Sequence, residues 1–444
     1  MTGAIDVGLL DPATGEAARL VGDAAYLEAM VDVEVALLGA LAEVGAAPPS
    51  ALTADLGPVL AGLDPAALGA AGRSGGNPVI PLLARLRPAL PEDLRDALHL
   101  GATSQDVIDS ATMLVASRVR AALRTALRPV LERLAALADD HRATPVAGRT
   151  LSQQAAPTTF GLRIAVLLDG VLRAARSLDA LELPAQLGGS VGTLAVLVDL
   201  LGEDRAEQVR GSFADRLGLA RRPTVWHVER GPVAELGARL AVLVGALGRI
   251  GLEIAQGSRA ELGELDVAVP EGEGGSSAMP QKRNPVAAVL LVAGARRAPG
   301  LAATLLGAQL ALDDRPAGDW HAEWQPLREL LRLVVEGAAL AHDAVGSLTV
   351  DAERMRANLE TTHGALHAER AQWALVPAVG RARAAALVRD ALAAPDFVAA
   401  LLDRLGGEDP ALADRIRAVT RTGGPVGLAD RIIDAVVADL RSTS

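Results

Sequence analysis

Apolar residues recur along most of this chain at the three- and four-residue spacing of one helix face, and the alternation typical of strands is scarce. The first predicted helix is capped by Asp23. Its spaced apolar positions are Met30, Val33, Leu37, Leu41 and Val44. A stretch rich in proline and glycine follows from Ala46 to about Pro81 and contains only short helical pieces.

From Asp106 onward the pattern predicts long helices. They cover Asp106–His141, Pro157–Glu182, Gly231–Leu265, Pro285–Leu312 and Glu323–Val345, the fourth kinked or broken at Pro299-Gly300. Several run roughly 25–35 residues, against an average of about 11–12 in globular proteins. Because they are apolar on most sides, they must be buried on most sides, which favours a bundle shared between subunits.

The predicted fold class is therefore all-α, in three helical domains. We expect an N-terminal helical domain over residues 1–105 and a central long-helix bundle over 106–347 that oligomerisation completes. From about Thr349 the predicted helices shorten, so residues 348–444 form a small C-terminal helical domain.

Composition supports a helical enzyme and excludes several other classes. Half of the 444 residues are apolar but only 2% are aromatic, and the abundant Ala and Leu are strong helix formers. There is no cysteine, which excludes disulfides and thiol catalysis. The net charge of −11 argues against general binding to nucleic acid or to an anionic membrane.

No targeting or membrane segment is predicted. The apolar run Pro285–Ala295 is stopped by Arg296 and Arg297, well short of the roughly 20 residues that span a bilayer. The N-terminus lacks a basic region followed by an apolar one, so we expect no signal peptide. These features and the missing cysteines predict a cytoplasmic protein.

The only lysine of the chain stands in its most unusual loop. Lysine and arginine together number 43, and Lys282 alone is a lysine. Arginine is a planar fork that stays protonated, whereas lysine is a compact charge with a tunable pKa. A chain that uses arginine at all its other basic positions is expected to keep Lys282 for chemistry.

The loop around Lys282 reads EGEGGSSAMPQKRNP from Glu271 to Pro285. Its glycines predict a mobile start, and Asn284 with Pro285 is a good helix entry. One interpretation is a connector between two helices. The other is a lid that brings Ser276 to a carbon acid and places the Lys282 ammonium beside developing negative charge.

The stretch Gly275–Asn284 resembles the signature of the fumarase/aspartase superfamily, which has a glycine, two serines, Met-Pro, and then Lys and Asn at these spacings. The resemblance implies that Ser276 is the catalytic acid/base. It also implies that Lys282 and Asn284 bind and polarise a substrate carboxylate.

A second segment, His99–Asp106, places Thr103 and Asp106 at the spacing of a capping box. Backbone N–H groups at such a helix start also bind carboxylates. The segment resembles the first signature region of the superfamily, and this implies that the hydroxyls of Thr103 and Ser104 hold a carboxylate of the substrate.

A third segment, Gly148–Gly161, is predicted to be a polar loop that enters a helix at Pro157. It resembles the second signature region, which implies a substrate-binding role for Gln153. Most lyases of the superfamily carry a histidine directly after Gly-Arg-Thr, and here that position is Leu151. The departure disfavours the fumarase-, argininosuccinate- and adenylosuccinate-lyase types.

The cycloisomerase branch of the superfamily commonly lacks that histidine, and other fragments resemble it. They are Gly76–Leu82, Gln186–Gly189, Trp226-His227 and Arg315–Trp324. The resemblance implies that Asn77 and Arg315 bind substrate, the latter as a fork for a carboxylate. Asp313 departs from the histidine that the branch usually has at this position. Trp320 and Trp324 are expected to pack at a helix entry.

The seven histidines are expected to differ in role. His141, near the end of a long helix, is a candidate second acid/base, and a charged imidazole is favoured at such a position. His227 and His321 lie in family-like motifs and are expected to shape the site. The remaining four are expected to cap or pack: His99, His342, His363 and His367. Their spacing shows no metal-ligand pattern, so neither a metal nor another cofactor is predicted.

The resemblance as a whole implies a homotetramer that acts on a small anionic polycarboxylate, with each site built from three chains and no nucleic-acid or membrane partner. The implied reaction is that of 3-carboxy-cis,cis-muconate cycloisomerase. There, one carboxylate adds across a C=C bond through an enediolate-like state. Two alternatives stay open. One is a fumarate-forming lyase of the same superfamily, and the other is a non-catalytic structural relative.

Overall fold

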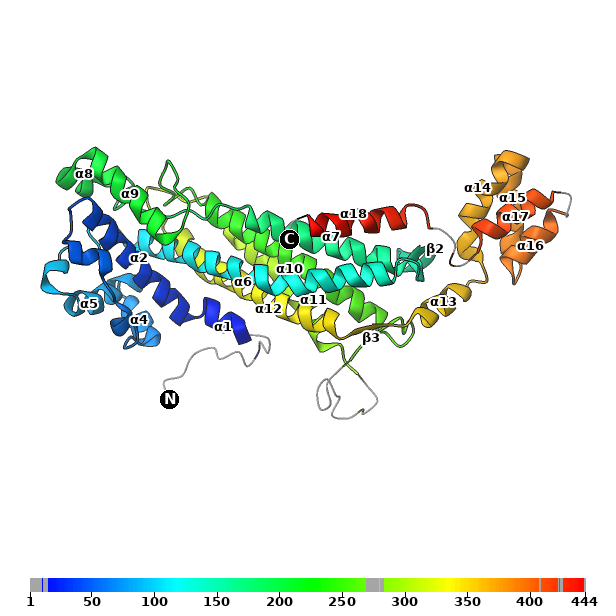
Figure 1. The fold of residues 1–444 in the computed structure, drawn as a ribbon, viewed down its shortest axis with the longest axis horizontal. Helices are drawn as coiled ribbons and strands as arrows, with labels where there is room; N and C mark the ends of the chain where they lie inside the picture. The colour runs from blue at the N-terminus through cyan, green and yellow to red at the C-terminus, as the bar shows by residue number, and fades with distance from the viewer. Residues whose placement is uncertain are drawn as a thin grey trace. The chain divides into compact units, whose positions relative to one another are not determined.

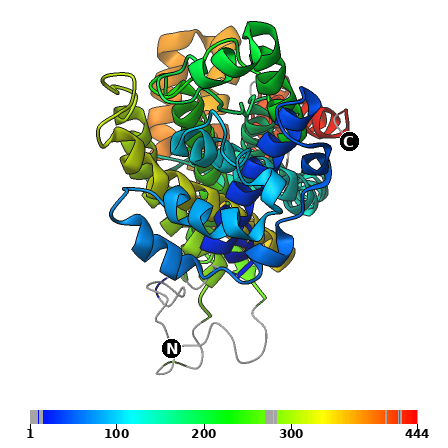
Figure 2. The same ribbon diagram turned by 90° about the vertical axis from the view of Figure 1, so that its left-hand side faces the viewer.

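The computed structural model describes residues 10, 15–268, 279, 283–406, 409–421, 423 and 426–442. The views in Figure 1 and Figure 2 show an almost entirely helical chain, so the all-α prediction is confirmed. Two compact units make up the chain. Unit 1 is Met1–Ala126, Ala174–Gly245 and Ala293–Ala339, and unit 2 is Leu127–Arg173, Ala246–Val292 and Leu340–Ser444. The division into three domains stays a prediction.

Five long helices contribute residues to both units. They are α6 (Ser104–Asp140), α7 (Phe160–Asp179), α10 (Gly231–Gly257), α11 (Val286–Gly307) and α12 (Asp319–Gly346). Each end of these helices lies within eight residues of the predicted end. Apart from these, unit 1 contains α1 (Gly15–Val21), α2 (Asp23–Glu43), α3 (Gly57–Leu60), α4 (Pro65–Gly72), α5 (Val79–Ala89), α8 (Ala195–Leu201), α9 (Glu203–Leu217), and the 3-10 turns η1 (Pro49–Thr53) and η2 (Glu92–Leu94).

Unit 2 adds a set of short helices after residue 351. They are α13 (Ala352–Glu360), α14 (Ala368–Val379), α15 (Arg381–Leu392), α16 (Phe397–Arg404), α17 (Pro410–Val419) and α18 (Ala429–Arg441), with the 3-10 turn η3 (Ala365–His367). Figure 1 shows α14 to α17 gathered into one group. This group has its own core, in which Leu375, Phe397, Leu401 and Ile416 are almost completely buried. The predicted shortening of the helices after Thr349 is therefore seen.

Two predicted helix boundaries and one predicted helix break were wrong. Helix α10 ends at Gly257 rather than Leu265, because the chain turns there and residues 265–267 form a strand. Helix α11 was predicted to be kinked or broken at Pro299, and the break is excluded because the helix runs through the proline. Pro299 is exposed, so the carbonyl that loses its hydrogen-bond partner can face solvent. Asp23 does not cap α2: it is the first helical residue, and Gly22 takes the cap position.

The third signature segment is a β-hairpin and not the predicted loop. Strand β1 (Pro145–Thr150) pairs antiparallel with β2 (Gln153–Thr159), and Thr150 lies opposite Gln153. The two turn residues, Leu151 and Ser152, have φ angles of 49° and 66°. Positive φ at both turn positions is the geometry of a two-residue hairpin turn, which glycine and asparagine normally supply. The turn therefore had no recognisable sequence signal.

A second small sheet joins β3 (Leu265–Val267) to β4 (Leu348–Val350) in antiparallel register, with Leu265 opposite Val350. Both strands belong to unit 2. Leu265 and Leu348 are buried. The sheet fixes the chain directly before the Gly-rich segment.

Helix α11 is, among the described residues, the one helix long and apolar enough to cross a membrane by length and composition. It includes Arg296 and Arg297, and only 22% of its most apolar window is buried within the chain. Length and composition are criteria that helices of soluble bundles also meet. The exposed apolar side chains of α11 include Val286, Val289 and Leu306.

Candidate active site

The start of helix α6 carries the two hydroxyls predicted to hold a carboxylate, those of Thr103 and Ser104. The backbone N–H of Thr103 donates to Asp106 Oδ2 at 3.0 Å, which is one half of the predicted capping box. The other half is absent, because the Thr103 hydroxyl accepts a hydrogen bond from Arg315 Nη1 at 2.7 Å. Two residues predicted to bind substrate, 212 positions apart in sequence, are thus in contact in unit 1.

Asp106 fixes the loop that carries Thr103. Its side chain is 1% exposed. Oδ1 accepts from the Gly188 backbone N–H at 3.0 Å and lies 2.8 Å from His227 Nε2, and Oδ2 also accepts from the Gly189 N–H at 2.9 Å. Both carboxylate oxygens are therefore engaged in holding the loop. Asp106 and His227 therefore shape the helix start, as expected for His227.

Arg315 keeps most of its hydrogen-bonding capacity. It is half-buried in the loop before α12, and among the described residues it forms no ion pair with a carboxylate. A guanidinium has five donors, and the Thr103 hydroxyl takes one. The remaining donors and the uncompensated charge suit a substrate carboxylate. Asp313, two residues earlier, is exposed and has a φ of 59°.

Asn77 lies in a loop of unit 1 and its amide serves the backbone. Oδ1 accepts from the Val79 N–H at 3.1 Å, and Nδ2 donates to the Gly75 carbonyl at 3.1 Å. His321 on α12 lies with Nε2 3.0 Å from the Gly76 carbonyl, which ties this loop to α12. The structure thus gives Asn77 a turn-forming role, and substrate binding by Asn77 stays a prediction.

A buried ionic cluster behind the helix start was not singled out in the sequence. Arg230, 1% exposed, donates from Nη1 to Asp109 Oδ2 at 2.8 Å and from Nη2 to Glu323 Oε2 at 2.6 Å. The Trp320 indole N–H donates to Asp109 Oδ1 at 3.0 Å, so Trp320 packs with its polar end paired. The cluster joins α6 to α12, the two helices next to Thr103 and Arg315. No local pattern in the sequence marked this cluster, because Asp109, Arg230 and Glu323 come from three distant segments.

The electrostatics of this cluster are unbalanced, because two carboxylates face one guanidinium. Burial raises the pKa of Glu323 to about 7, although the hydrogen bonds and charge of Arg230 act to lower it. Burial alone would lower the pKa of Arg230, but Asp109 and Glu323 raise it. Glu323 is thus a buried acid that titrates near neutral pH.

In unit 2 the hairpin β1–β2 presents Gln153 at its turn. Gln153 and Leu151 are both exposed, Leu151 by 98%. A buried network braces the hairpin: Arg149 Nη1 donates to Glu264 Oε2 at 2.9 Å, and Asn358 Nδ2 donates to Glu264 Oε1 at 2.8 Å. Substrate binding by Gln153 stays a prediction.

His141 follows directly after the last residue of α6, in unit 2. Its Nδ1 lies 3.1 Å from Thr144 Oγ1, and its ring meets the Phe160 ring edge-on at 5.5 Å between centroids. Burial and the charge of Arg133 lower the pKa of His141, with Asp140 opposing them. The lowered pKa favours the neutral ring at neutral pH, and a neutral imidazole is able to accept a proton.

Of the Gly-rich segment, Ser276 and Lys282 lie outside the described residues. Asn284 is half-buried directly before α11, and its carbonyl accepts from the Val286 N–H at 2.8 Å. Arg283 Nη1 lies 3.7 Å from Asp266 Oδ2 on β3. No group of three or more His, Asp or Glu in the described ranges could hold a metal ion.

His99, expected to cap or pack, forms a close pair with a buried acid: its Nδ1 lies 2.7 Å from Glu34 Oε1. Burial would lower the pKa of His99, but Glu34 raises it overall. His367 is buried in η3, and burial lowers its pKa. Both serve packing rather than an open site.

Comparison with known proteins identifies the family of the chain. Residues 77–300 match the family model described as Lyase. The chain is 44% identical to nitrosuccinate lyase of Streptomyces davaonensis over 86% of its own length and 83% of that protein. It is 40% identical to 3-carboxy-cis,cis-muconate cycloisomerase of Pseudomonas aeruginosa over 82% of its length and 80% of that protein.

A solved structure shares the fold as well. The 3-carboxy-cis,cis-muconate lactonizing enzyme from Pseudomonas putida superposes with a TM-score of 0.86 at 30% identity, over 98% of this chain and all of that one. The chain therefore belongs to the lyase family of the fumarase/aspartase superfamily, and it is an enzyme of that superfamily. Within it, the relatives named here are a lyase, a cycloisomerase and a lactonizing enzyme.

Proposed function

We propose that this enzyme catalyses the cycloisomerisation of 3-carboxy-cis,cis-muconate to carboxymuconolactone. The observation that carries the proposal is the contact of Arg315 with Thr103 at the start of α6. It places a guanidinium that has no carboxylate partner in the described part of the chain beside a hydroxyl and a helix N-terminus, three groups that bind carboxylate. The resemblance to cycloisomerases in sequence and in structure supports the choice of reaction.

In the proposed reaction one carboxylate oxygen of the substrate adds to its own conjugated C=C bond, and a proton goes to the carbon beside another carboxylate. No atom is gained or lost. The intermediate carries two charges on one carboxylate. Lys282, Asn284, Thr103 and Ser104 would stabilise it, each donor contributing on the order of 3 kcal/mol. Ser276 would deliver the proton.

The remaining proposed roles concern binding and a second proton. Arg315 would hold a carboxylate that does not react, and Gln153 and Asn77 would contact the rest of the substrate. His141 is proposed as the second acid/base. Its pKa is lowered by burial, which keeps the imidazole neutral and basic at neutral pH.

A second candidate function is elimination of nitrite from nitrosuccinate. The 44% identity to nitrosuccinate lyase favours it. A base would remove the proton next to one carboxylate, the C–N bond would break, and nitrite and fumarate would leave. The same donors would stabilise the same kind of intermediate. This reaction is a fumarate-forming elimination, the alternative that the sequence left open.

One experiment separates the two candidates. The purified enzyme is incubated with 3-carboxy-cis,cis-muconate and, separately, with nitrosuccinate. Loss of diene absorbance without nitrite release is expected. Nitrite release from nitrosuccinate with an unchanged diene would establish the lyase instead, and no turnover of either compound would leave only the superfamily assignment.

We further propose a cytoplasmic homotetramer in which three chains contribute to each site. The exposed apolar residues of α11 support association, because a surface of this kind is normally covered. Light scattering after size-exclusion chromatography gives the mass directly. A monomer that turns over substrate at full rate would contradict the shared site.

A further inference from the structure

Helix α2 carries a feature that packing alone does not require, the buried carboxylate of Glu34. This side chain is 0% exposed, and the other buried residues of α2 are apolar or glycine. Oε1 lies 2.7 Å from His99 Nδ1, whereas Oε2 is buried without a hydrogen-bond partner in the described part of the chain. A half-satisfied buried carboxylate is less stable than an apolar side chain of similar size. Glu34 therefore has a role other than stability.

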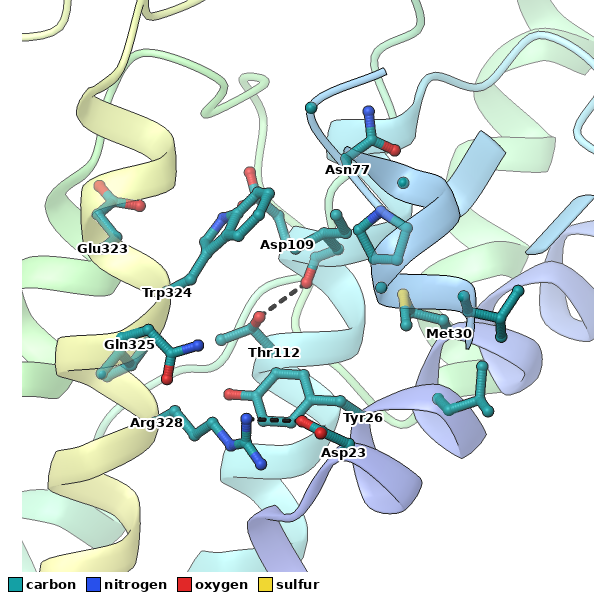
Figure 3. Close-up of a pocket in the computed structure, with 18 of the residues that line it drawn as sticks. Asp23, Tyr26, Met30, Asn77, Asp109, Thr112, Glu323, Trp324, Gln325 and Arg328 are labelled. Carbon is teal, nitrogen blue, oxygen red and sulfur yellow. Dashed lines mark hydrogen bonds and ion pairs between the residues drawn. The ribbon is translucent and has the colours of Figure 1, made fainter. Parts of the chain in front are cut away.

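The pair of Glu34 and His99 does not face an open cavity. Met30, one turn before Glu34 on α2, lines the cavity drawn in Figure 3. Asn77, a proposed substrate contact, lines the same cavity, which therefore belongs to the proposed site. Neither Glu34 nor His99 lines it. An effect of the pair on a substrate has to pass through the residues that follow His99 in the chain.

Those residues form a turn that leads directly to Thr103. His99 has a φ of 64° and Gly101 a φ of 74°. A left-handed conformation is uncommon for a residue other than glycine, although histidine tolerates it better than most. The N–H of Ala102 donates to the His99 carbonyl at 3.3 Å and closes the turn. Because the backbone at His99 does not favour this conformation by itself, contacts of its side chain have to maintain it.

Side chains anchor the turn at both ends. At its start, Glu34 holds the imidazole of His99, and Arg87 Nη2 donates to the preceding carbonyl at 3.3 Å. At its end, Asp106 Oδ2 accepts from the Thr103 N–H at 3.0 Å. The Thr103 hydroxyl, which the proposed carboxylate site uses, is therefore positioned from both sides.

The charge of His99 determines how firmly the start of the turn is held. Burial acts to lower the pKa of His99, but the hydrogen bond and charge of Glu34 raise it above the ordinary 6.5. Asp106 on α6 adds to this rise, and Arg87 on α5 opposes it. A protonated imidazole makes a charge-assisted hydrogen bond to Glu34, about twice as strong as a neutral one. As the pH rises through the raised pKa, the pair keeps only the neutral hydrogen bond.

We propose that Glu34 and His99 are positioning residues for the carboxylate site, because they hold the turn that presents Thr103 and Ser104 to the substrate. The inference rests on the proposed function only in that Thr103 binds a carboxylate, and it is the same for either candidate reaction. Neither residue of the pair touches the substrate. Carboxylate binding is tightest while His99 is protonated, and it weakens as the pH rises above 6.5.

Propane-1,2,3-tricarboxylate is the probe for this site, because it carries carboxylates and has no C=C bond that could react. Isothermal titration calorimetry of the full-length protein from pH 6 to pH 9 measures its Kd. The affinity of the wild type should fall over this range by about 3- to 10-fold more than that of His99→Asn. Comparison of the two proteins at each pH cancels the ionisation of the probe.

Two substitutions remove the charge of the pair and keep its shape. Asn in His99→Asn tolerates a positive φ and carries a side-chain N–H that can donate to Glu34. Glu34→Gln keeps an acceptor for the Nδ1–H of His99. From pH 7 upward each variant should have the weaker affinity that the wild type reaches at pH 9, and the double variant should be no weaker than either. Uniformly weaker binding with the pH slope of the wild type would overturn the proposal.

Leu37→Ala is the control for a general weakening of α2. Leu37 is 2% exposed, so its truncation lowers the free energy of unfolding in urea while the contact of Glu34 with His99 remains. Probe affinity should stay within about 2-fold of the wild type at every pH. If Leu37→Ala flattens the pH profile as Glu34→Gln does, the positioning role is refuted.

Turnover separates this inference from the proposed reaction. An enzyme that leaves 3-carboxy-cis,cis-muconate unchanged but binds the probe with the expected pH dependence refutes the reaction and supports the pair. An enzyme that turns over the substrate but binds the probe equally well in the wild type, His99→Asn and Glu34→Gln at every pH refutes the pair and leaves the reaction standing. A wild type that does not bind the probe at any pH also refutes the pair.

Discussion

Arg315 Nη1 donates a hydrogen bond to the Thr103 hydroxyl over 2.7 Å, joining the loop before α12 to the first turn of α6. In a complete capping box the Thr103 hydroxyl would accept a hydrogen bond from a backbone N–H of its own helix. In the structure it accepts one from Arg315 instead. With Asp106 holding the Thr103 N–H instead, the hydroxyl and the guanidinium form one surface. Both groups are half-buried, and each still has an N–H or O–H able to donate to a ligand, which is the chemistry of a carboxylate site.

The first prediction concerns this pair. Arg315→Lys keeps the charge and loses the planar fork, so kcat/KM should fall by about 10- to 100-fold. Steady-state kinetics on the substrate that the wild type turns over measures it. Thr103→Val should cost less, and the double variant should cost less than the sum of the two, because the residues are in contact. Additive losses in the double variant would mean that Arg315 and Thr103 act independently of each other.

The second prediction concerns the proton donor. Ser276→Ala should lower kcat by roughly two to four orders of magnitude, the usual effect of removing a positioned proton donor. Ser277→Ala, the neighbouring hydroxyl, is the matched control and should retain activity within about 10-fold. Activity of Ser276→Ala near that of the parent would contradict the assignment, and loss only in Ser277→Ala would move the role by one residue.

Helices in this protein could be predicted because their signals are local. Ala- and Leu-rich segments with apolar residues three and four apart gave α6, α7, α10, α11 and α12, with errors mainly at the ends. The hairpin β1–β2 was not predicted because Leu151 and Ser152 occupy its turn at positive φ. Glycine or asparagine, which usually mark such a turn, are absent there. The local sequence does not favour this turn. Arg149 on β1 pairs with Glu264, and this contact with a distant part of the chain stabilises the hairpin.

Candidate site residues could be proposed from the sequence only where they form a contiguous motif. Thr103, Ser104 and Arg315 lie in recognisable segments, and the structure shows two of them in contact. The cluster of Arg230, Asp109 and Glu323 was missed because its members come from three distant segments, and single charged residues in amphipathic helices usually face solvent. Only the fold brings them together.

The third prediction concerns stability and pH through Glu323. Its pKa is raised from 4.5 to about 7 in the folded protein, so the folded state binds the proton more tightly than the unfolded state. Stability contributed by the protonated acid is present below pH 4.5 and is lost as the pH rises to about 7. The full shift corresponds to about 3 kcal/mol, an order-of-magnitude figure.

Urea unfolding from pH 5 to pH 8 at one protein concentration tests this. The free energy of unfolding should decline more steeply with pH in the wild type than in Glu323→Gln, whose side chain cannot titrate. Gln also leaves Arg230 paired with Asp109. Parallel pH profiles would show that Glu323 stays ionised throughout this range.

The last prediction concerns His141 and the pH dependence of the rate. Burial and Arg133 lower its pKa below the ordinary 6.5, so the imidazole is neutral at pH 7 and gains a proton only at lower pH. If it serves as the second base, kcat/KM should fall on the acid side with an apparent pKa below 6.5, and His141→Asn should remove that limb and cost about 10²-fold or more. Thr144→Val, which deletes only the hydroxyl 3.1 Å from Nδ1, should keep the limb and move its pKa. An unchanged acid limb in His141→Asn would assign it to another group, because a purely structural histidine would alter the rate at every pH alike.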